Sequence, residues 1–195
     1  MSVTLHKRGV THVPRKAKTP QEETELIEKA ATGDKSAFGA LYKIYQPRVF
    51  RHIFFLVSNH HTAEDLTAQT FLQALEAIHR YEIRNVPFLA WLLRIAYHLS
   101  VNHLRNRSNG TDPLPQRELP NDQQLPEAIA ETSDEARRAQ ELVRGLKGDR
   151  RRVIVMFFLE DLSLSDIASV LGKSIGAVRA LKCRALQDLR QRAES

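Results

Sequence analysis

Apolar residues recur every three or four positions through most of residues 20–107, which is the spacing of one face of an α-helix. Pro20 after Thr19 is typical of a helix start, and Gly33 of a helix end. Helices are therefore predicted at 20–31, at 35–45 with Asp34 as cap, from Pro47 through VFRHIFFLV, after a Thr62 cap, and at 87–107. No stretch alternates apolar and polar residues with period two, so we expect an all-α protein with little or no sheet.

Residues 108–132 interrupt this helical periodicity. The stretch has four prolines and many polar side chains, and proline both removes a backbone donor and disfavours helix in the preceding residue. We interpret it as a flexible linker between two small helical domains. The predicted parts are a basic arm at 1–19, an N-terminal domain at 20–107, the linker at 108–132 and a C-terminal domain at 133–195.

The helix that Thr62 caps has two different sides at about 100° per residue. Its core side contains Ala63, Leu66, Thr70, Ala74, Ala77, Ile78 and Tyr81. The opposite side, here called the acidic face, consists of Asp65, Gln69, Leu72 and Glu76. A leucine among acidic and amide groups can anchor a partner protein. The alternative is an ordinary solvated face with a single leucine, and the residues alone favour that alternative.

The helix predicted at 87–107 has a row of residues that suits single-stranded nucleic acid. This polar stripe, spaced by 3, 4, 4 and 3 positions, consists of Trp91, Arg94, His98, Asn102 and Arg105. Bases stack on aromatic and guanidinium planes, cations hold phosphates, and an amide reads base edges. Alternatively, Trp91 closes the edge of the core and the other four residues form a solvated surface.

The C-terminal segment has the spacing of a helix-turn-helix. Ala168 is small where two helices cross, Gly172 suits a left-handed turn, and Ser174 can cap the second helix. The positions of that helix expected to face inward are Ile175, Val178, Leu181, Ala185 and Leu189. The positions expected to meet DNA, here called the reading face, are Ser174, Gly176, Arg179, Ala180, Cys183 and Arg184. Arg179 is placed to read bases and Arg184 to hold phosphate, whereas a helical hairpin for protein contact is the alternative.

Composition narrows the possible classes of function. The chain has 195 residues, a net charge of +6 and one cysteine, which excludes an internal disulfide framework and a cysteine-rich zinc site. No apolar run reaches the roughly 18 residues of a membrane span, and the basic N-terminus lacks the apolar centre of a secretory signal. We therefore expect a cytoplasmic protein without membrane insertion. Basic residues gather at both ends, which suits a polyanion as well as solubility.

The histidines and carboxylates do not have the spacing of a catalytic or metal site. His60 and His61 are adjacent and are expected to point apart, and His98 and His103 fall on different helix faces. The sequence has no Gly-rich phosphate loop, nucleophile elbow or paired-carboxylate arrangement. We expect no metal, no cofactor and no catalytic residue.

Four motifs, in this order, resemble the bacterial RNA polymerase sigma factors of the extracytoplasmic-function (ECF) class, over about residues 22–192. GDKSAFGALYKIYQPRVFRHI resembles the first conserved helices of the family, and AEDLTAQTFLQAL resembles its polymerase-binding helix. FLAWLLRIAYHLSVNHLR resembles the promoter-melting helix. LSLSDIASVLGKSIGAVRALKCRALQDLR resembles the helix-turn-helix for the upstream promoter element.

The resemblance implies a role for each set of residues. The acidic face would dock on the clamp coiled coil of the largest polymerase subunit, although Ala68 stands where the family usually has glutamine. The polar stripe and the loop at 81–87 would capture a flipped base of the −10 element, although the family often has asparagine at the position of His98. The reading face would recognise the −35 element.

The implied function is that of an alternative sigma factor, not itself an enzyme, which binds core RNA polymerase and directs promoter-specific initiation. Its expected partners are core polymerase, promoter DNA in duplex and single-stranded form, and an anti-sigma factor. Two alternatives stay open. A stand-alone helix-turn-helix regulator would explain residues 133–195 but neither the acidic face nor the polar stripe. An anti-sigma-like interaction protein would not need an outward Arg179 beside such a turn.

Overall fold

The computed structural model describes residues 20–83, 86–108, 138, 141–143, 145–146 and 148–193. Its helical elements are α1 (Pro20–Ala31), α2 (Lys35–Val57), α3 (His60–Ala77), a 3-10 turn (Ile78–Arg80), α4 (Phe88–Ser108), α7 (Asp149–Ile154), a π-helical turn η3 (Val155–Leu159), α8 (Leu164–Leu171) and α9 (Ile175–Ala193). These ranges contain no strand, which confirms the predicted all-α fold. The predicted arm at 1–19 and residues 109–132 of the predicted linker lie outside the described residues, so the domain boundaries stay predictions.

The helices predicted at 35–45 and from Pro47 are one continuous helix, α2, so the predicted break was wrong. Proline removes one intrahelical hydrogen bond, which ordinarily interrupts a helix. Here the turns on both sides of Pro47 are buried, because Tyr45 is 2% exposed and Val49 is fully buried. The packing of these flanking turns compensates for the missing backbone bond. Asp34 does cap α2, as predicted.

The capping of α2 and α3 shows what starts each helix. The Asp34 carboxylate accepts hydrogen bonds from the Ser36 hydroxyl and backbone and from the Ala37 backbone, at 2.8 to 3.1 Å. These bonds, the Ser36 hydroxyl first, lower the pKa of Asp34. The cap of α3 was predicted at Thr62, which was wrong. Asn59 is the cap, and its side chain accepts from the Thr62 backbone at 2.9 Å, so α3 begins at His60.

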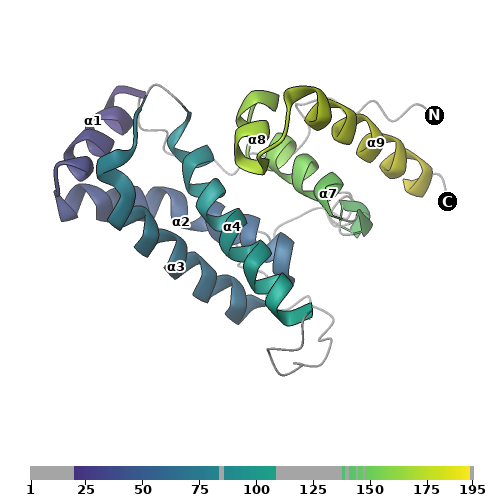
Figure 1. Ribbon diagram of the computed structural model, residues 1–195, viewed down its shortest axis with the longest axis horizontal. Coiled ribbons are helices and arrows are strands. Elements are labelled where there is room, and N and C mark those ends of the chain that lie inside the picture. Colours follow the sequence, from purple (N-terminus) through teal and green to yellow (C-terminus); the bar gives the residue numbers. More distant parts are fainter. Residues whose placement is uncertain are drawn as a thin grey trace.

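Helix α2 is the centre of the N-terminal helices and packs against α1, α3 and α4 (Figure 1). Of the seven residues predicted on the core side of the helix that corresponds to α3, Ala63, Leu66, Thr70, Ala74 and Ile78 are buried, whereas Ala77 and Tyr81 are half-buried. The Thr70 hydroxyl lies in this core because it donates to the Leu66 carbonyl at 2.7 Å. Helix α4 supplies the other wall of the core through Leu92, Leu93 and Ala96, which are fully buried.

The C-terminal helices form the predicted helix-turn-helix. Ser163 and Asp166 make a reciprocal capping box at the start of α8. Gly172 ends α8 in the left-handed conformation with φ of 62°, and the Ser174 hydroxyl accepts from the Ala177 backbone at 3.2 Å to start α9. Figure 1 shows α8 beside α4, and apolar residues of α8 belong to the same core cluster as those of α2 and α4.

We predict that Gly172→Ala lowers the free energy of unfolding by about 1 kcal/mol, because a Cβ disfavours the left-handed conformation. A Cβ at Gly172 would meet no atom within 4 Å, so the cost arises in the backbone alone. Gly176→Ala is the matched control, since its Cβ also meets nothing within 4 Å and the residue is helical. We expect the control to be neutral or slightly stabilising. Urea denaturation measures both, and equal effects would contradict this account of the turn.

Candidate polymerase and nucleic-acid interfaces

The acidic face is fully on the surface of α3. Asp65, Gln69, Leu72 and Glu76 are all exposed, and Leu72 has 58% of its surface accessible. Ala68, the position that departs from the family pattern, is exposed on the same helix. A leucine this exposed has no structural role in its own helix bundle. The surface therefore has the composition of a protein-docking site, an apolar residue surrounded by charged and amide groups.

Two apolar residues beside the acidic face were missed by the sequence analysis. Leu75 is 43% exposed on α3, and Tyr42 is 41% exposed on α2. The Tyr42 ring packs edge-on against Phe71, with ring centroids 4.7 Å apart, and Leu75 lies one turn beyond Phe71. A helical wheel places Leu75 about 100° from the core residue Ala74, at the margin of the core side, so the sequence pattern could have identified Leu75 as exposed. A wheel could not have identified Tyr42, because its ring packs against Phe71, which lies in another helix.

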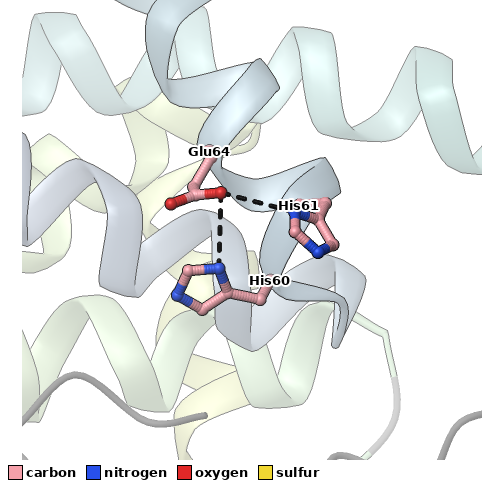
Figure 2. A group of neighbouring side chains, drawn as sticks. All are labelled: His60, His61 and Glu64. Atoms are coloured by element: carbon pink, nitrogen blue, oxygen red, sulfur yellow. Dashed lines mark ion pairs between the residues drawn. The ribbon is translucent and has the colours of Figure 1, made fainter.

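The first turn of α3 contains a cluster that the sequence analysis described wrongly. His60 and His61 were expected to point apart, but both rings face the carboxylate of Glu64 (Figure 2). Their Nδ1 atoms lie 3.4 and 3.6 Å from Glu64 Oε2. The reason is that Glu64 is four residues from one histidine and three from the other, and both spacings bring side chains together on a helix. The three groups could hold a metal ion, but His61 and Glu64 are largely exposed, as in ordinary surface ion pairs.

Four residues of the polar stripe are exposed, and the fifth is partly covered by the core. Arg94, His98, Asn102 and Arg105 are exposed along α4, whereas Trp91 is only half-exposed. The Trp91 ring packs against Tyr81 and Phe88, with ring centroids 5.1 and 5.4 Å away. Trp91 is therefore at the edge of the core, as the alternative interpretation held, and its ring continues into the exposed stripe.

A hydrogen bond from Tyr81 joins the two ends of the loop before α4. The Tyr81 hydroxyl donates to the Val86 carbonyl at 2.7 Å, and burial raises the pKa of Tyr81 to about 12. Residues 84–85 lie outside the described part of the chain. The hydrogen bond and the Trp91–Tyr81–Phe88 ring cluster fix both ends of the loop next to the start of the polar stripe.

The reading face lies on the exposed side of α9. Its members Ser174, Gly176, Arg179, Ala180, Cys183 and Arg184 are all exposed. Of the residues expected inward, Val178, Ala185 and Leu189 are buried and Leu181 is half-buried. Ile175 was expected inward, which was wrong, because it is 47% exposed. Ile175 is the first residue of α9, so no preceding turn of its own helix lies beneath its side chain.

The cations of the helix-turn-helix divide into engaged and free groups. Lys173 pairs with Asp149 at 3.1 Å, and the Lys182 ammonium lies 4.2 Å from the centroid of the Phe157 ring. Although burial opposes it, hydrogen bonds from Lys173 and Arg152 keep the pKa of Asp149 below its usual value. Within the described residues, the side chains of Arg179 and Arg184 make no ion pair or hydrogen bond. Their guanidinium groups are therefore available to a polyanion.

Comparison with known proteins identifies the class. The family model for sigma-70 region 2 matches residues 41–110, and the model for sigma-70 region 4 matches residues 136–189. The ECF RNA polymerase sigma factor SigC of Mycobacterium tuberculosis is 33% identical over 178 residues, covering 88% of this chain and 91% of SigC. The ECF sigma factor BldN of Streptomyces coelicolor is 34% identical over 167 residues, which are 85% of this chain but 63% of BldN.

Solved structures show the same fold. CnrH, in complex with the cytosolic domain of CnrY, superposes with a TM-score of 0.65 at 22% identity, covering 89% of this chain and 97% of CnrH. The sigma factor RpoE of Bartonella quintana, in complex with the anti-sigma factor NepR, gives 0.61 at 21% identity over 79% of this chain and 94% of that one. The chain belongs to the ECF RNA polymerase sigma factors, as its motifs predicted. Region 2 comprises most of α2 with α3 and α4, and region 4 comprises α7 to α9.

No helix among the described residues is long and apolar enough to cross a membrane.

Proposed function

We propose that this chain binds core RNA polymerase and directs promoter-specific initiation, with α4 melting and recognising the −10 element and α9 reading the −35 element. One observation carries the proposal. A single chain presents an exposed acidic face, an exposed polar stripe and an exposed reading face, on the helices that match regions 2 and 4 of the family. A stand-alone regulator would use only the last of these surfaces.

The acidic face of α3 is the proposed polymerase contact. Leu72 is the apolar anchor, and Asp65, Gln69 and Glu76 give the charge and amide groups around it. Leu75 extends the apolar area toward α2. An exposed leucine that becomes buried at an interface contributes affinity, and the surrounding carboxylates select a basic partner surface.

The polar stripe of α4 is the proposed contact for the melted −10 element. Arg94 and Arg105 would hold phosphates, and His98 and Asn102 would meet base edges. The half-exposed ring of Trp91, backed by Tyr81 and Phe88, offers a stacking surface at the end of the stripe. Stacking there offsets the few kcal/mol that unstacking one base step costs.

The reading face of α9 is the proposed contact for the −35 element in duplex form. The first residues of a recognition helix contact base edges, so Arg179 would lie near the groove floor and Arg184 nearer the flank. Ile175 is exposed at the helix start, where an aliphatic side chain suits the methyl group of thymine. Ala180 and Cys183 are small and allow the helix to approach the bases closely.

Phosphodiester synthesis belongs to the polymerase, so we propose that this chain is not an enzyme, needs no cofactor and acts with its polymerase in the cytoplasm. We also propose an anti-sigma partner, because RpoE was solved in complex with the anti-sigma factor NepR, and CnrH was solved in complex with the cytosolic domain of CnrY. Transcription from a cognate promoter by sigma-free core polymerase plus this chain tests the whole proposal. No promoter-dependent transcript would leave a stand-alone regulator or an interaction protein as the function.

We predict that Asp65→Lys with Leu72→Glu weakens binding to core polymerase by more than a hundredfold and leaves the fold intact. Both side chains are exposed, so neither supports the core, whereas a reversed charge and a buried carboxylate at an interface cost several kcal/mol. A binding titration with labelled protein measures the loss. The matched control, Glu25→Lys with Glu28→Lys on exposed positions of α1, should bind normally. Undiminished binding by the well-folded double variant would refute the acidic face as the contact.

We predict that His98→Ala with Asn102→Ala reduces open-complex formation about tenfold or more while core binding is retained. Each base contact of this kind contributes about 1–3 kcal/mol, and both residues are exposed on the polar stripe. Permanganate reactivity of promoter thymines measures the melted strand. His61→Ala, an exposed histidine on α3, is the control and should melt normally. Normal reactivity in the double variant would exclude the stripe as a reader of single strands.

We predict that Arg179→Ala and Arg184→Ala have different signatures on a library of −35 elements. Loss of a two-bond contact to guanine removes about 1–3 kcal/mol of discrimination, so Arg179→Ala should change the ranking of the variants. Arg184→Ala should weaken all variants equally and lower the salt dependence of binding by about one counterion. A uniform loss with Arg179→Ala would show that Arg179 contacts phosphate only.

A further inference from the structure

Three side chains in the first turn of α3 bring two imidazoles and one carboxylate together (Figure 2). His60 Nδ1 lies 3.4 Å and His61 Nδ1 lies 3.6 Å from the same oxygen, Glu64 Oε2. One ligand atom from each residue lies within 4.8 Å of the other two, and no other such group occurs in the part of the chain that the structure describes. The group, here called the histidine cluster, belongs to none of the three surfaces in the proposed function.

The distances in the histidine cluster suit a shared cation better than two hydrogen bonds. An N–H···O hydrogen bond spans about 2.7–3.2 Å, and both separations are longer. Two ligands bound at about 2.1 Å in a tetrahedral shell lie about 3.4 Å from each other. Both separations are within about 0.2 Å of that length, which is the usual tolerance for a metal site. The three donors therefore match one side of a tetrahedral shell and leave the fourth position to water.

Packing positions one of the imidazoles before any ion binds. The His60 side chain is 27% exposed, and its ring lies edge-on to Phe50 of α2 with the ring centroids 5.2 Å apart. Glu64 is four residues further along the helix, a spacing that places its carboxylate beside His60. His61 is largely exposed and completes the cluster from the outer side. The entropy cost of ordering side chains on binding therefore falls mainly on the two outer residues.

The donor atoms select a class of ion. Imidazole nitrogen suits Zn²⁺, Ni²⁺ and Cu²⁺, whereas Mg²⁺ and Ca²⁺ take oxygen ligands. Two imidazoles, one carboxylate and a water are a set that Zn²⁺ accepts. The dipole of α3 disfavours a cation at this end of the helix, and the Glu64 carboxylate opposes that effect. Because His61 and Glu64 are exposed, binding is weaker than in a buried structural zinc site and is reversible.

The histidine cluster continues the acidic face toward the start of α3. His61 precedes Asp65 by four residues and Leu72 by eleven, so at about 100° per residue the three lie within about 40° on one side of the helix. All three are exposed. A bound divalent ion adds two positive charges to a cluster in which the Glu64 carboxylate has the one formal negative charge. A basic partner surface that covers this end of the acidic face would then meet a repulsive charge.

We propose that His60, His61 and Glu64 bind a divalent transition-metal ion of the Zn²⁺ type, and that the bound ion weakens the contact between the acidic face and its basic partner. The ion site follows from the geometry of the cluster. The effect on the partner rests on the proposed function, in which that partner is core polymerase. Surface charges are screened over about 8 Å at physiological ionic strength, so the loss of affinity is about twofold to fivefold. The ion adjusts the contact and is not needed for it.

Calorimetric titration of the full chain with ZnCl₂, in a buffer that does not chelate metals, tests the site without polymerase or DNA. We expect one ion per chain, a dissociation constant tighter than about 100 µM and no competition from excess Mg²⁺. His61→Ala and Glu64→Gln each remove a donor at an exposed position and should weaken binding at least about tenfold. His79→Ala and Glu28→Gln, matched changes at exposed positions outside the cluster, should bind Zn²⁺ as the unchanged protein does.

Electron spin resonance of bound Cu²⁺ counts the coordinated imidazoles directly. The unchanged protein and His79→Ala should both show two nitrogen donors, and His61→Ala should show one. A dissociation constant for Zn²⁺ weaker than about 100 µM would overturn the site. Equal Zn²⁺ binding by His61→Ala, Glu64→Gln and the unchanged protein would also overturn it, because the ion would then lie elsewhere in the chain.

The effect on the partner is measured by titrating core polymerase with and without Zn²⁺, at a concentration that fills the unchanged cluster and leaves Glu64→Gln mostly empty. Zn²⁺ should weaken polymerase binding by the unchanged protein about twofold to fivefold and should not change binding by Glu64→Gln. The variant also controls for Zn²⁺ acting on the polymerase, which would affect both proteins equally. An equal effect on both proteins, or none on either, would refute the effect on the partner. If core polymerase binds neither protein at all, the proposed function fails while the calorimetry still decides the ion site.

Discussion

Burial along α2 is the constraint on which the other helices depend. The helix contacts α1, α3, α4 and η3, and nearly every residue of its last two turns is buried, including Ile53, Phe54 and Val57. A helix segment that is apolar on most of its sides must be covered there by other elements. The N-terminal helices cover most of it, and the remaining side, with Arg48 and Arg51, is covered by the end of η3. The C-terminal helices therefore cover the side of α2 that the N-terminal helices leave uncovered.

Local chemistry made most of the fold predictable, and long-range packing accounts for the errors. The caps at Asp34 and Ser174 and the turn at Gly172 act over three or four residues, so their spacing was sufficient to predict them. The break predicted at Pro47 was wrong because the turns on both sides of the proline are buried against helices that are distant in the sequence. A proline rule describes one helix in isolation, whereas the stability of α2 comes from three neighbouring helices. The contact between the two halves had no local signal, because Glu160 is more than a hundred residues from its partners.

The candidate surfaces were predictable to the extent that a helical wheel describes them. Exposure of the acidic face and of Arg179 follows from the angular position of each residue, and the structure agrees. The helical wheel failed at helix starts, where Ile175 is exposed and where the rings of His60 and His61 both lie close to Glu64. At a helix start, the preceding turn on which a side chain would lie is missing. The roles of these surfaces were inferred from resemblance and stay proposals.

The interface between the two halves combines an ionic part with an apolar part. A purely apolar contact would be costly to open, because every buried surface would meet water without compensation. Charged groups behave differently, because hydration recovers much of what their separation loses. In this chain the ionic part of the contact lies at the α2–η3 end, and the apolar part lies along α4 and α8.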